Sequence, residues 1–320
     1  YFGGGTPSRL DNQAFGEIFE TLFSHFPIEE DAEITLEANP DDLSEEYIHL
    51  LRKLPFNRIS IGIQSFDDGE LKFLSRRHSA RQAIQAVKLC RQAGFENISI
   101  DLMYGLPGQT PGIWEKSLRQ ACELDVWHIS AYHLIYEKQT RLYALLQKGS
   151  VRPVTDEAST EMFSMLIDTL AQNGFEHYEI SNFAKSKKYS IHNTSYWKNE
   201  KYIGLGPSAH SYDGENRSWN IASLEKYITA IQSGELLQET EKLTFTQKYN
   251  EFILTGLRTM WGVDLNLLKE KFGQELFDYC LQNARKFIRE GFLVSKDNSL
   301  IMNRKGIFIS DGIMSELMRV

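Results

Sequence analysis

The stretch Ile98-Ser99-Ile100-Asp101-Leu102-Met103-Tyr104-Gly105-Leu106-Pro107-Gly108 reads as an apolar β-strand that ends in a turn rich in glycine and proline. Further runs of β-branched, aliphatic or aromatic residues lie at 34–36, 59–63, 126–132 and 178–180. Helix-like stretches separate them, and such alternation is typical of a parallel sheet with crossover helices. The sequence therefore predicts an α/β fold, with a partial (β/α) barrel as first choice and an open doubly wound sheet as second.

The helices between these strands have recognisable beginnings. Ser79 begins one of them, because Gln82 completes a capping box three residues later. Thr110-Pro111 begins another, with proline at the first helical position. Apolar residues at helical spacing predict two more, over about 15–23 and 155–173.

The strand–helix alternation stops after Asn182, and a different pattern begins at about Leu243. Thr244 and Gln247 predict a capped helix, two more helical stretches follow, and a short strand pair lies within 292–302. These elements predict a small winged-helix-like domain. We therefore predict three parts: a barrel-like core over 1–182, an aromatic-rich linking region over 183–240, and a C-terminal helical domain over 241–320.

Composition excludes several classes of protein. The net charge of −8 and the lack of a long basic run argue against a nucleic-acid partner. Hydrophobic residues make up 42% of the chain, which fits a globular core, but no apolar run is long enough to span a membrane. Cys90, Cys122 and Cys280 are scattered and odd in number, so they predict no disulfide framework and favour a reducing, cytoplasmic location.

Glycines and polar side chains gather where the predicted strands end. Gly3-Gly4-Gly5-Thr6-Pro7 follows the first segment, Glu37 and Gln64 end the next two, and Asp101 lies within an apolar strand. Parallel strands end at one edge, where such folds bind ligands. A triple glycine alone is usually a turn, and a lone Glu or Gln has ordinary structural uses. A charge in an apolar strand is costly unless it is paired, so the set together predicts a site for a polar ligand.

In order and spacing, these elements resemble the motifs of radical S-adenosylmethionine (SAM) proteins of the oxygen-independent coproporphyrinogen III oxidase family. The resemblance extends over nearly the whole chain, through residues 1–7, 36–40, 61–66, 74–78, 100–108 and 130–134 and the C-terminal domain. It implies a partial, TIM-like barrel of the radical SAM type with a small C-terminal helical domain. It also implies SAM and a [4Fe-4S] cluster as cofactors.

In that family the glycine turn holds the methionine end of SAM. The residues that the resemblance assigns to SAM are Gly4, Gly5, Thr6, Glu37, Gln64, Arg76 and Asp101. Their chemistry agrees, because arginine suits the carboxylate of SAM, and aspartate and glutamine suit ribose hydroxyls. Arg77 is an alternative to its neighbour Arg76. Ile135 is a weaker assignment, at a position where the family backs the adenine with a small or apolar residue.

The CxxxCxxC motif that holds the cluster in the family lies upstream of the glycine turn and does not occur in this chain. The three cysteines cannot replace it, because each lies alone on a predicted helix. We therefore expect the cluster cysteines upstream of Tyr1 and no metal ligands in this chain. We also expect the fragment itself to be inactive in radical chemistry, and we assign no catalytic residue.

A second motif, Ile191-His192-Asn193-Thr194-Ser195-Tyr196-Trp197, resembles the HNxxYW sequence of the haem-chaperone branch of the family. The resemblance implies that His192, Tyr196 and Trp197 bind haem. An imidazole offers an axial nitrogen to the iron, and the aromatic rings offer flat apolar faces to the porphyrin. The aromatic residues are also compatible with an ordinary domain-interface core. The rival histidines are His78, His133 and His210.

The resemblance as a whole implies a SAM- and [4Fe-4S]-binding haem chaperone that delivers haem to haemoproteins. The alternative is an oxygen-independent coproporphyrinogen III oxidase, which would decarboxylate two propionates to vinyl groups; a family member with another substrate is a third reading. The implied partners are haem or porphyrin and the recipient haemoproteins. A peripheral membrane contact and a monomeric or dimeric state are left open.

Overall fold

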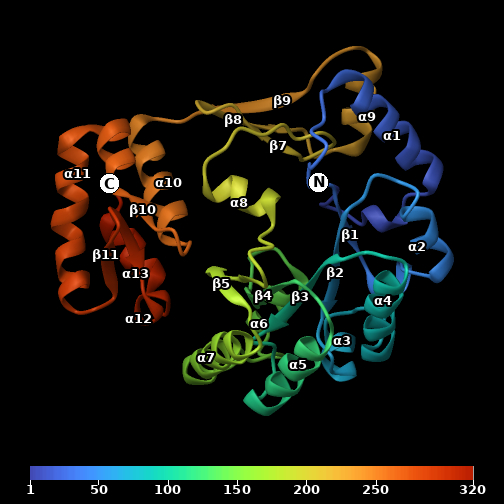
Figure 1. The fold of residues 1–320 in the computed structure, drawn as a ribbon, viewed down its shortest axis with the longest axis horizontal. Helices are drawn as coiled ribbons and strands as arrows, with labels where there is room; N and C mark the ends of the chain where they lie inside the picture. Colours follow the sequence, from blue (N-terminus) through green and yellow to red (C-terminus); the bar gives the residue numbers. More distant parts are fainter. Residues whose placement is uncertain (320) are drawn as a thin grey trace. The chain divides into compact units, whose positions relative to one another are not determined.

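The computed structural model describes residues 1–319 and divides the chain into two compact units (Figure 1). Unit 1 is Tyr1–Ser190, and unit 2 begins at Ile191. Each unit encloses its own cluster of buried apolar side chains. The two units are therefore described separately.

Within residues 1–190, six strands form one sheet in the order β1-β2-β3-β4-β6-β5. β1 to β4 are parallel to one another, whereas β6 is antiparallel to both of its neighbours, β4 and β5. Asn182 therefore begins an antiparallel strand instead of ending a parallel one, because β5 and β6 form a tight hairpin. The strands are β1 (Thr35–Ala38), β2 (Arg58–Gln64), β3 (Asn97–Tyr104), β4 (His128–His133), β5 (Glu176–Glu179) and β6 (Asn182–Ala184).

The helices of unit 1 connect these strands, and most of them bury apolar side chains against one face of the sheet. The capping box of Ser79 and Gln82 is confirmed, and Thr110 caps α5 with proline at its first position. The helices are α1 (Asn12–His25), α2 (Glu45–Leu51), α3 (Asp68–Phe73), α4 (Ala80–Gln92), α5 (Pro111–Glu123), α6 (Arg141–Gln147) and α7 (Asp156–Gln172), with short 3-10 turns η1 (Pro7–Arg9) and η2 (Pro40–Asp42).

The two faces of this sheet differ completely in polarity, because successive side chains of a strand point to opposite faces. The outer face carries apolar residues that are buried against the helices: Leu36, Ala38, Ile59, Ile61, Ile63, Ile98, Ile100, Leu102, Ile129 and Ala131. The alternate residues define the inner face: Thr35, Glu37, Arg58, Ser60, Ser99, Asp101, His128 and Ser130. The predicted α/β class is confirmed, and polar side chains predominate on the inner face across β1 to β4.

Unit 2 contains two small antiparallel sheets, in the orders β7-β8-β9 and β10-β12-β11. The first sheet and two helices fill the predicted linking region: α8 (Ile191–Trp197), β7 (His210–Tyr212), β8 (Asn216–Asn220), α9 (Leu224–Gln232) and β9 (Gln238–Lys242). The rest comprises α10 (Phe245–Leu257), β10 (Val263–Asp264), α11 (Leu265–Arg289), β11 (Leu293–Lys296), β12 (Ser299–Met302), α12 (Arg304–Ile307) and α13 (Ser310–Leu317).

The C-terminal elements match the predicted winged-helix-like arrangement. Thr244 and Gln247 form the predicted capping box of α10. Gly273 has non-helical dihedral angles (φ +80°), so α11 consists of two helical stretches separated by a kink. The antiparallel pair of β11 and β12 follows them. None of the helices in the described part of the chain has the length and hydropathy that a bilayer-spanning helix needs.

Candidate functional site

The glycine turn at the start of the chain is tied to Glu37 of β1. The Tyr1 hydroxyl donates to Glu37 Oε1 (2.6 Å), and the Gly4 N–H donates to Glu37 Oε2 (3.3 Å). A side chain at Gly3 would collide with both Tyr1 and Glu37, and Gly4 has a positive φ of +96°. Open space surrounds the α-carbons of Gly4 and Gly5. The turn therefore presents bare backbone beside a fixed carboxylate.

Asp101 lies on the inner face of the sheet beside serines of the two neighbouring strands. Ser130 of β4 is its partner in the β-ladder, and Ser60 Oγ of β2 donates to its Oδ1 (3.4 Å). Burial raises the pKa of Asp101 to about 6, and the charge of Glu37 adds to the increase, while the hydrogen bond from Ser130 opposes it. A ligand that donates hydrogen bonds or carries positive charge would stabilise the ionised carboxylate.

Gln64 and Arg76 approach each other over Gly62 of β2. A methyl group built on Gly62 would lie 2.9 Å from Arg76 Nη2 and 3.1 Å from Gln64 Nε2. Gln64 has a left-handed backbone (φ +70°) where the register between β2 and β3 shifts. Because such a conformation is unfavourable for a residue with a side chain, it is a sign of a functional constraint.

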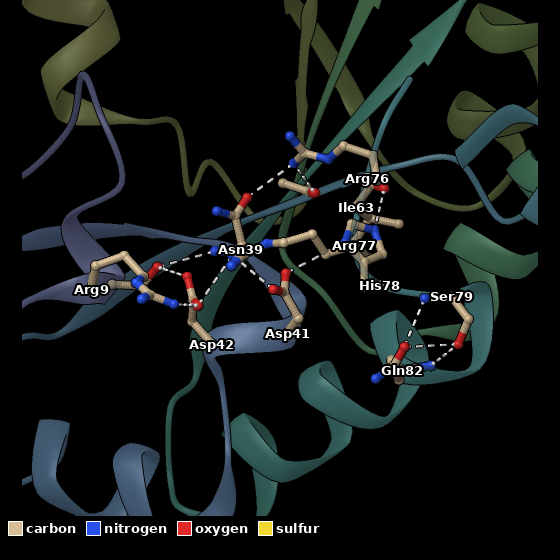
Figure 2. Close-up of polar contacts among 12 residues, drawn as sticks. Arg9, Asn39, Asp41, Asp42, Ile63, Arg76, Arg77, His78, Ser79 and Gln82 are labelled. Carbon is tan, nitrogen blue, oxygen red and sulfur yellow. Dashed lines mark hydrogen bonds and ion pairs between the residues drawn. The ribbon is translucent and has the colours of Figure 1, made fainter. Parts of the chain in front are cut away.

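The structure separates the roles of Arg76 and Arg77. Arg76 Nη2 donates to the Gly62 carbonyl (2.7 Å) and to Asn39 Oδ1 (3.1 Å). Burial lowers the pKa of Arg76, and the negative charges of Asp41 and Asp101 oppose that decrease. Arg77 instead forms ion pairs with the carboxylates of Asp41 (2.7 Å) and Asp42 (3.3 Å). Figure 2 shows the two guanidinium groups directed to different partners. Of the pair, Arg76 is the one that lies near Asp101.

The loops that carry these residues are linked to one another. Asp42 accepts a hydrogen bond from Ser8 (2.8 Å) and pairs with Arg9 (3.5 Å) as well as Arg77. These contacts join the segment after the glycine turn, the loop after β1 and the loop after α3 (Figure 2). The predicted SAM residues Gly4, Gly5, Glu37, Gln64, Arg76 and Asp101 thus lie around one end of the inner face. Thr6 caps η1 without a side-chain hydrogen bond, and Ile135 follows β4 with 73% of its side chain exposed.

Sequence analysis missed two supports of this region. Buried Glu70 accepts a hydrogen bond from Ser65 (2.5 Å) in the loop after β2, and burial raises its pKa while Ser65 and Gln109 oppose the increase. Gln109 in turn accepts from the Gly105 N–H (2.7 Å) in the loop after β3. Glu70 looks like an ordinary surface residue of a short helix, so no sequence pattern identifies it.

A buried hydrogen-bonded chain crosses the other end of the inner face. His128 Nδ1 is 2.7 Å from Ser99 Oγ, and its Nε2 is 2.8 Å from the Tyr178 hydroxyl. That hydroxyl also accepts from the N–H of Ser190, the last residue of unit 1 (3.4 Å). Burial lowers the pKa of His128 well below its ordinary value, so this imidazole is neutral. In the sequence, only the alternation of polar and apolar residues in β3 and β4 indicated that Ser99 and His128 share the inner face.

In unit 2, the residues of the HNxxYW motif lie on α8. His192 and Tyr196 are four residues apart on one helix face, and their rings meet edge to face with centroids 4.8 Å apart. Tyr196 makes a second edge-to-face contact with Tyr202 (4.7 Å). Trp197 lies under the guanidinium of Arg258 (5.0 Å). Tyr196 and Trp197 also line a cavity of about 310 Å³.

The rival histidines have other surroundings. His78 is 4% exposed, and its Nε2 is 3.0 Å from the Ile63 carbonyl. His133 is held between Ser159 (2.6 Å) and the Leu134 carbonyl (2.9 Å). His210 is exposed on β7 and lies 5.9 Å from the ring of Trp219. His192 is the histidine that shares a helix face with Tyr196.

The cysteines were tested against the geometry of an iron–sulfur cluster. Cys90 and Cys280 are buried in the separate cores of the two units, and burial raises their thiol pKa values to about 12 and about 11. Cys122 lies on α5. Over residues 1–319, no three His, Cys, Asp or Glu side chains form a group that could hold a metal ion. The cysteines of this chain therefore do not fit a cluster.

Two family descriptions match the chain. Residues 1–121 match the radical SAM superfamily, and residues 243–309 match the HemN C-terminal domain. The first match contains the glycine turn, Glu37, Gln64, Arg76 and Asp101. The second coincides with the winged-helix-like part of unit 2.

Relatives with similar sequences cover almost the whole chain. The heme chaperone HemW of Bacillus subtilis is 34% identical over 98% of this chain and 83% of that protein. HemW of Lactococcus lactis is 33% identical over 99% and 84%. The mitochondrial radical S-adenosyl methionine domain-containing protein 1 of Bos taurus is 31% identical over 99% and 75%.

A solved structure shows the same fold. The coproporphyrinogen III oxidase HemN from Escherichia coli, described as a radical SAM enzyme, aligns with 99% of this chain and 76% of its own, with a TM-score of 0.82 and 21% identity. This similarity confirms the predicted partial barrel and the C-terminal domain.

Proposed function

The chain belongs to the HemW family of radical SAM proteins, and from this premise we propose that it is a haem chaperone that binds SAM in unit 1 and haem in unit 2. The observation that carries the proposal is the arrangement on α8. His192 presents an imidazole next to Tyr196, beside an aromatic cavity, in a chain that is similar to HemW proteins along nearly its whole length.

His192 is the proposed iron ligand, and Tyr196 and Trp197 are the proposed porphyrin contacts. A neutral imidazole nitrogen is a common axial ligand of haem iron. Tyr196 and Trp197 add flat apolar surface, which a macrocycle needs to leave water.

For unit 1 we propose SAM as the ligand. The backbone of Gly4 and Gly5 would face its charged methionine end, with Thr6 beside them, and Arg76 would meet its carboxylate. The ionised side chain of Asp101 and the amide of Gln64 would accept and donate hydrogen bonds to the ribose hydroxyls. Glu37 would hold the glycine turn in place, because it already bonds to Gly4.

We further propose that haem taken up on α8 is delivered to recipient haemoproteins from the cytoplasm. The scattered cysteines and the similarity to bacterial HemW proteins support this location and these partners. A pull-down with the haem-loaded protein as bait would detect direct contact with a recipient haemoprotein.

Haem titration tests the chaperone assignment. The chain should bind haem with a visible spectrum typical of histidine-ligated iron, and His192→Ala should abolish that spectrum. His210→Ala is the matched control, because His210 is an exposed histidine of the same unit and should leave the spectrum unchanged. A wild-type spectrum from His192→Ala would overturn the assignment of the iron ligand.

A conversion assay separates the chaperone from the coproporphyrinogen oxidase. The natural protein, prepared anaerobically, is incubated with SAM, a reductant and coproporphyrinogen III, and the masses of the porphyrin products are measured by mass spectrometry. We expect no change in mass together with retained haem binding. Loss of two carboxyl groups would make the protein an oxidase.

A further inference from the structure

The cavity beside α8 combines aromatic walls with one partly exposed ion pair. Tyr196 and Trp197 of α8 line it together with Tyr202, Tyr212, Arg217 and Glu251. Its volume of about 310 Å³ lies at the lower end of the ~300–1,000 Å³ range of small-molecule sites. That volume is too small for a whole macrocycle with its substituents, but it admits one edge of a macrocycle.

Arg217 supplies the positive charge in this cavity. It extends from β8, and its Nη2 donates to Glu251 Oε1 of α10 (2.8 Å). The guanidinium has five N–H donors, so one contact with Glu251 leaves others for a second acceptor. About a third of each side chain of the pair is exposed (35% and 28%), so Glu251 can turn towards solvent when another carboxylate takes its place.

Edge-to-face ring contacts connect the cavity to His192. Tyr196 touches His192 on one side (4.8 Å between centroids) and Tyr202, a wall of the cavity, on the other (4.7 Å). The charge of Arg217 also influences the pKa of Tyr202, so Arg217 lies near that hydroxyl. Tyr196 is therefore shared between the contact with His192 and the wall of the cavity.

We propose that this cavity receives a propionate-bearing edge of the porphyrin, with Arg217 as the cation that binds the propionate and Glu251 as the internal anion that the propionate displaces. The proposal rests on the proposed haem-binding function and names a second point of attachment for the same ligand. A planar guanidinium suits this role, because it binds a carboxylate through two parallel hydrogen bonds. Glu200 and Glu251, the two acids of the lining, favour a site that is closed to carboxylates until Glu251 moves.

The two members of the ion pair should act in opposite directions on haem affinity. Arg217→Gln should weaken haem binding about tenfold, because it removes the positive charge. Arg217→Lys should lose less affinity, because lysine keeps the charge but lacks the two parallel N–H donors of the guanidinium. Glu251→Gln should tighten binding several-fold, since it removes the competing anion. Haem dimethyl ester, whose propionates carry no charge, should bind equally to all of these variants and to the wild type.

Arg289→Gln is the matched control, since it removes the same charge from the exposed last turn of α11 in the same unit. It should leave the affinity for haem and for the ester unchanged. The thermal midpoint of each variant is measured beside the titration. The inference is overturned if Glu251→Gln weakens haem binding as Arg217→Gln does, or if Arg217→Gln weakens haem and the ester equally, because either result makes the pair merely structural. Failure of the wild type to bind haem would overturn the proposed function itself.

Discussion

The inner face of the sheet in unit 1 and the surroundings of α8 in unit 2 present functional groups in different ways. In unit 1, Asp101 and Glu37 are placed by strand register, and their neighbours are serines, a glycine turn and arginine. In unit 2, His192 and Tyr196 lie on a seven-residue helix and meet other aromatic rings edge to face. The first region offers hydrogen-bonding groups, which suit the small charged ligand proposed for it, and the second offers aromatic rings, which suit the large flat one.

The largest expected effect concerns the charge of Asp101. Its pKa of about 6 in the folded protein lies above the ordinary value of 3.8, so folding favours the protonated form. The stability gained from that proton is complete below about pH 4 and is lost as the pH rises through 6. Asp101→Asn should therefore raise the free energy of unfolding by up to about 3 kcal/mol at pH 8 and by little at pH 4.

Urea unfolding of both proteins at pH 4, 6 and 8 measures this difference, and a SAM titration at pH 8 accompanies it. The more stable variant should bind SAM more weakly, which is the cost expected when a charge is kept for function. If the difference in unfolding free energy between the two proteins does not change with pH, the buried charge of Asp101 is not its cause. Such a result would make the inner face resemble an ordinary polar surface.

A smaller effect separates Arg76 from Arg77. Arg76→Gln should weaken SAM binding by about 2 kcal/mol, the typical value of a hydrogen bond between charged groups. Arg77→Gln should leave SAM affinity nearly unchanged, because Arg77 is paired with Asp41 and Asp42. Isothermal titration of the two single variants measures both. Equal losses would show that the charge of the loop, rather than the direction of one side chain, attracts the ligand.

The smallest effect tests the flat surface of unit 2. Tyr196→Ala should weaken haem binding by about 1 kcal/mol, because it removes an aromatic face and two ring contacts. Tyr196→Phe keeps the ring and should bind haem like the wild type. Titrations followed by visible absorption compare the three proteins. If Tyr196→Phe binds haem as weakly as Tyr196→Ala does, the hydroxyl of Tyr196 matters instead of its ring. Unit 2 would then bind its ligand through hydrogen bonds, as is proposed for unit 1.

The polar inner face could be predicted in part because strands alternate. Asp101 among Ile98, Ile100 and Leu102 is visible in the sequence as a charge in an apolar strand, and strand ends converge in any parallel sheet. The antiparallel β6 could not be predicted, since three residues are too few to show a period. The different partners of Arg76 and Arg77 also could not be predicted, because adjacent residues in a loop have no fixed directions.

The cavity in unit 2 had no sequence signal of its own. Arg217 and Glu251 are 34 positions apart and meet only because β8 lies against α10. Each reads as an ordinary surface charge in its own segment. Glu70 and Gln109 escaped notice for the same reason, since their contacts join loops that follow different strands.

The chain of Ser99, His128 and Tyr178 has a mechanical consequence for the boundary between the units. Its last bond anchors the backbone of Ser190, whose side chain is fully buried, immediately before α8 begins. The Ser190 amide should therefore be protected from hydrogen exchange as long as this hydrogen bond and the buried residues around it stay closed. The ordered part of unit 1 therefore extends to its last residue, directly before α8 (Ile191–Trp197) begins.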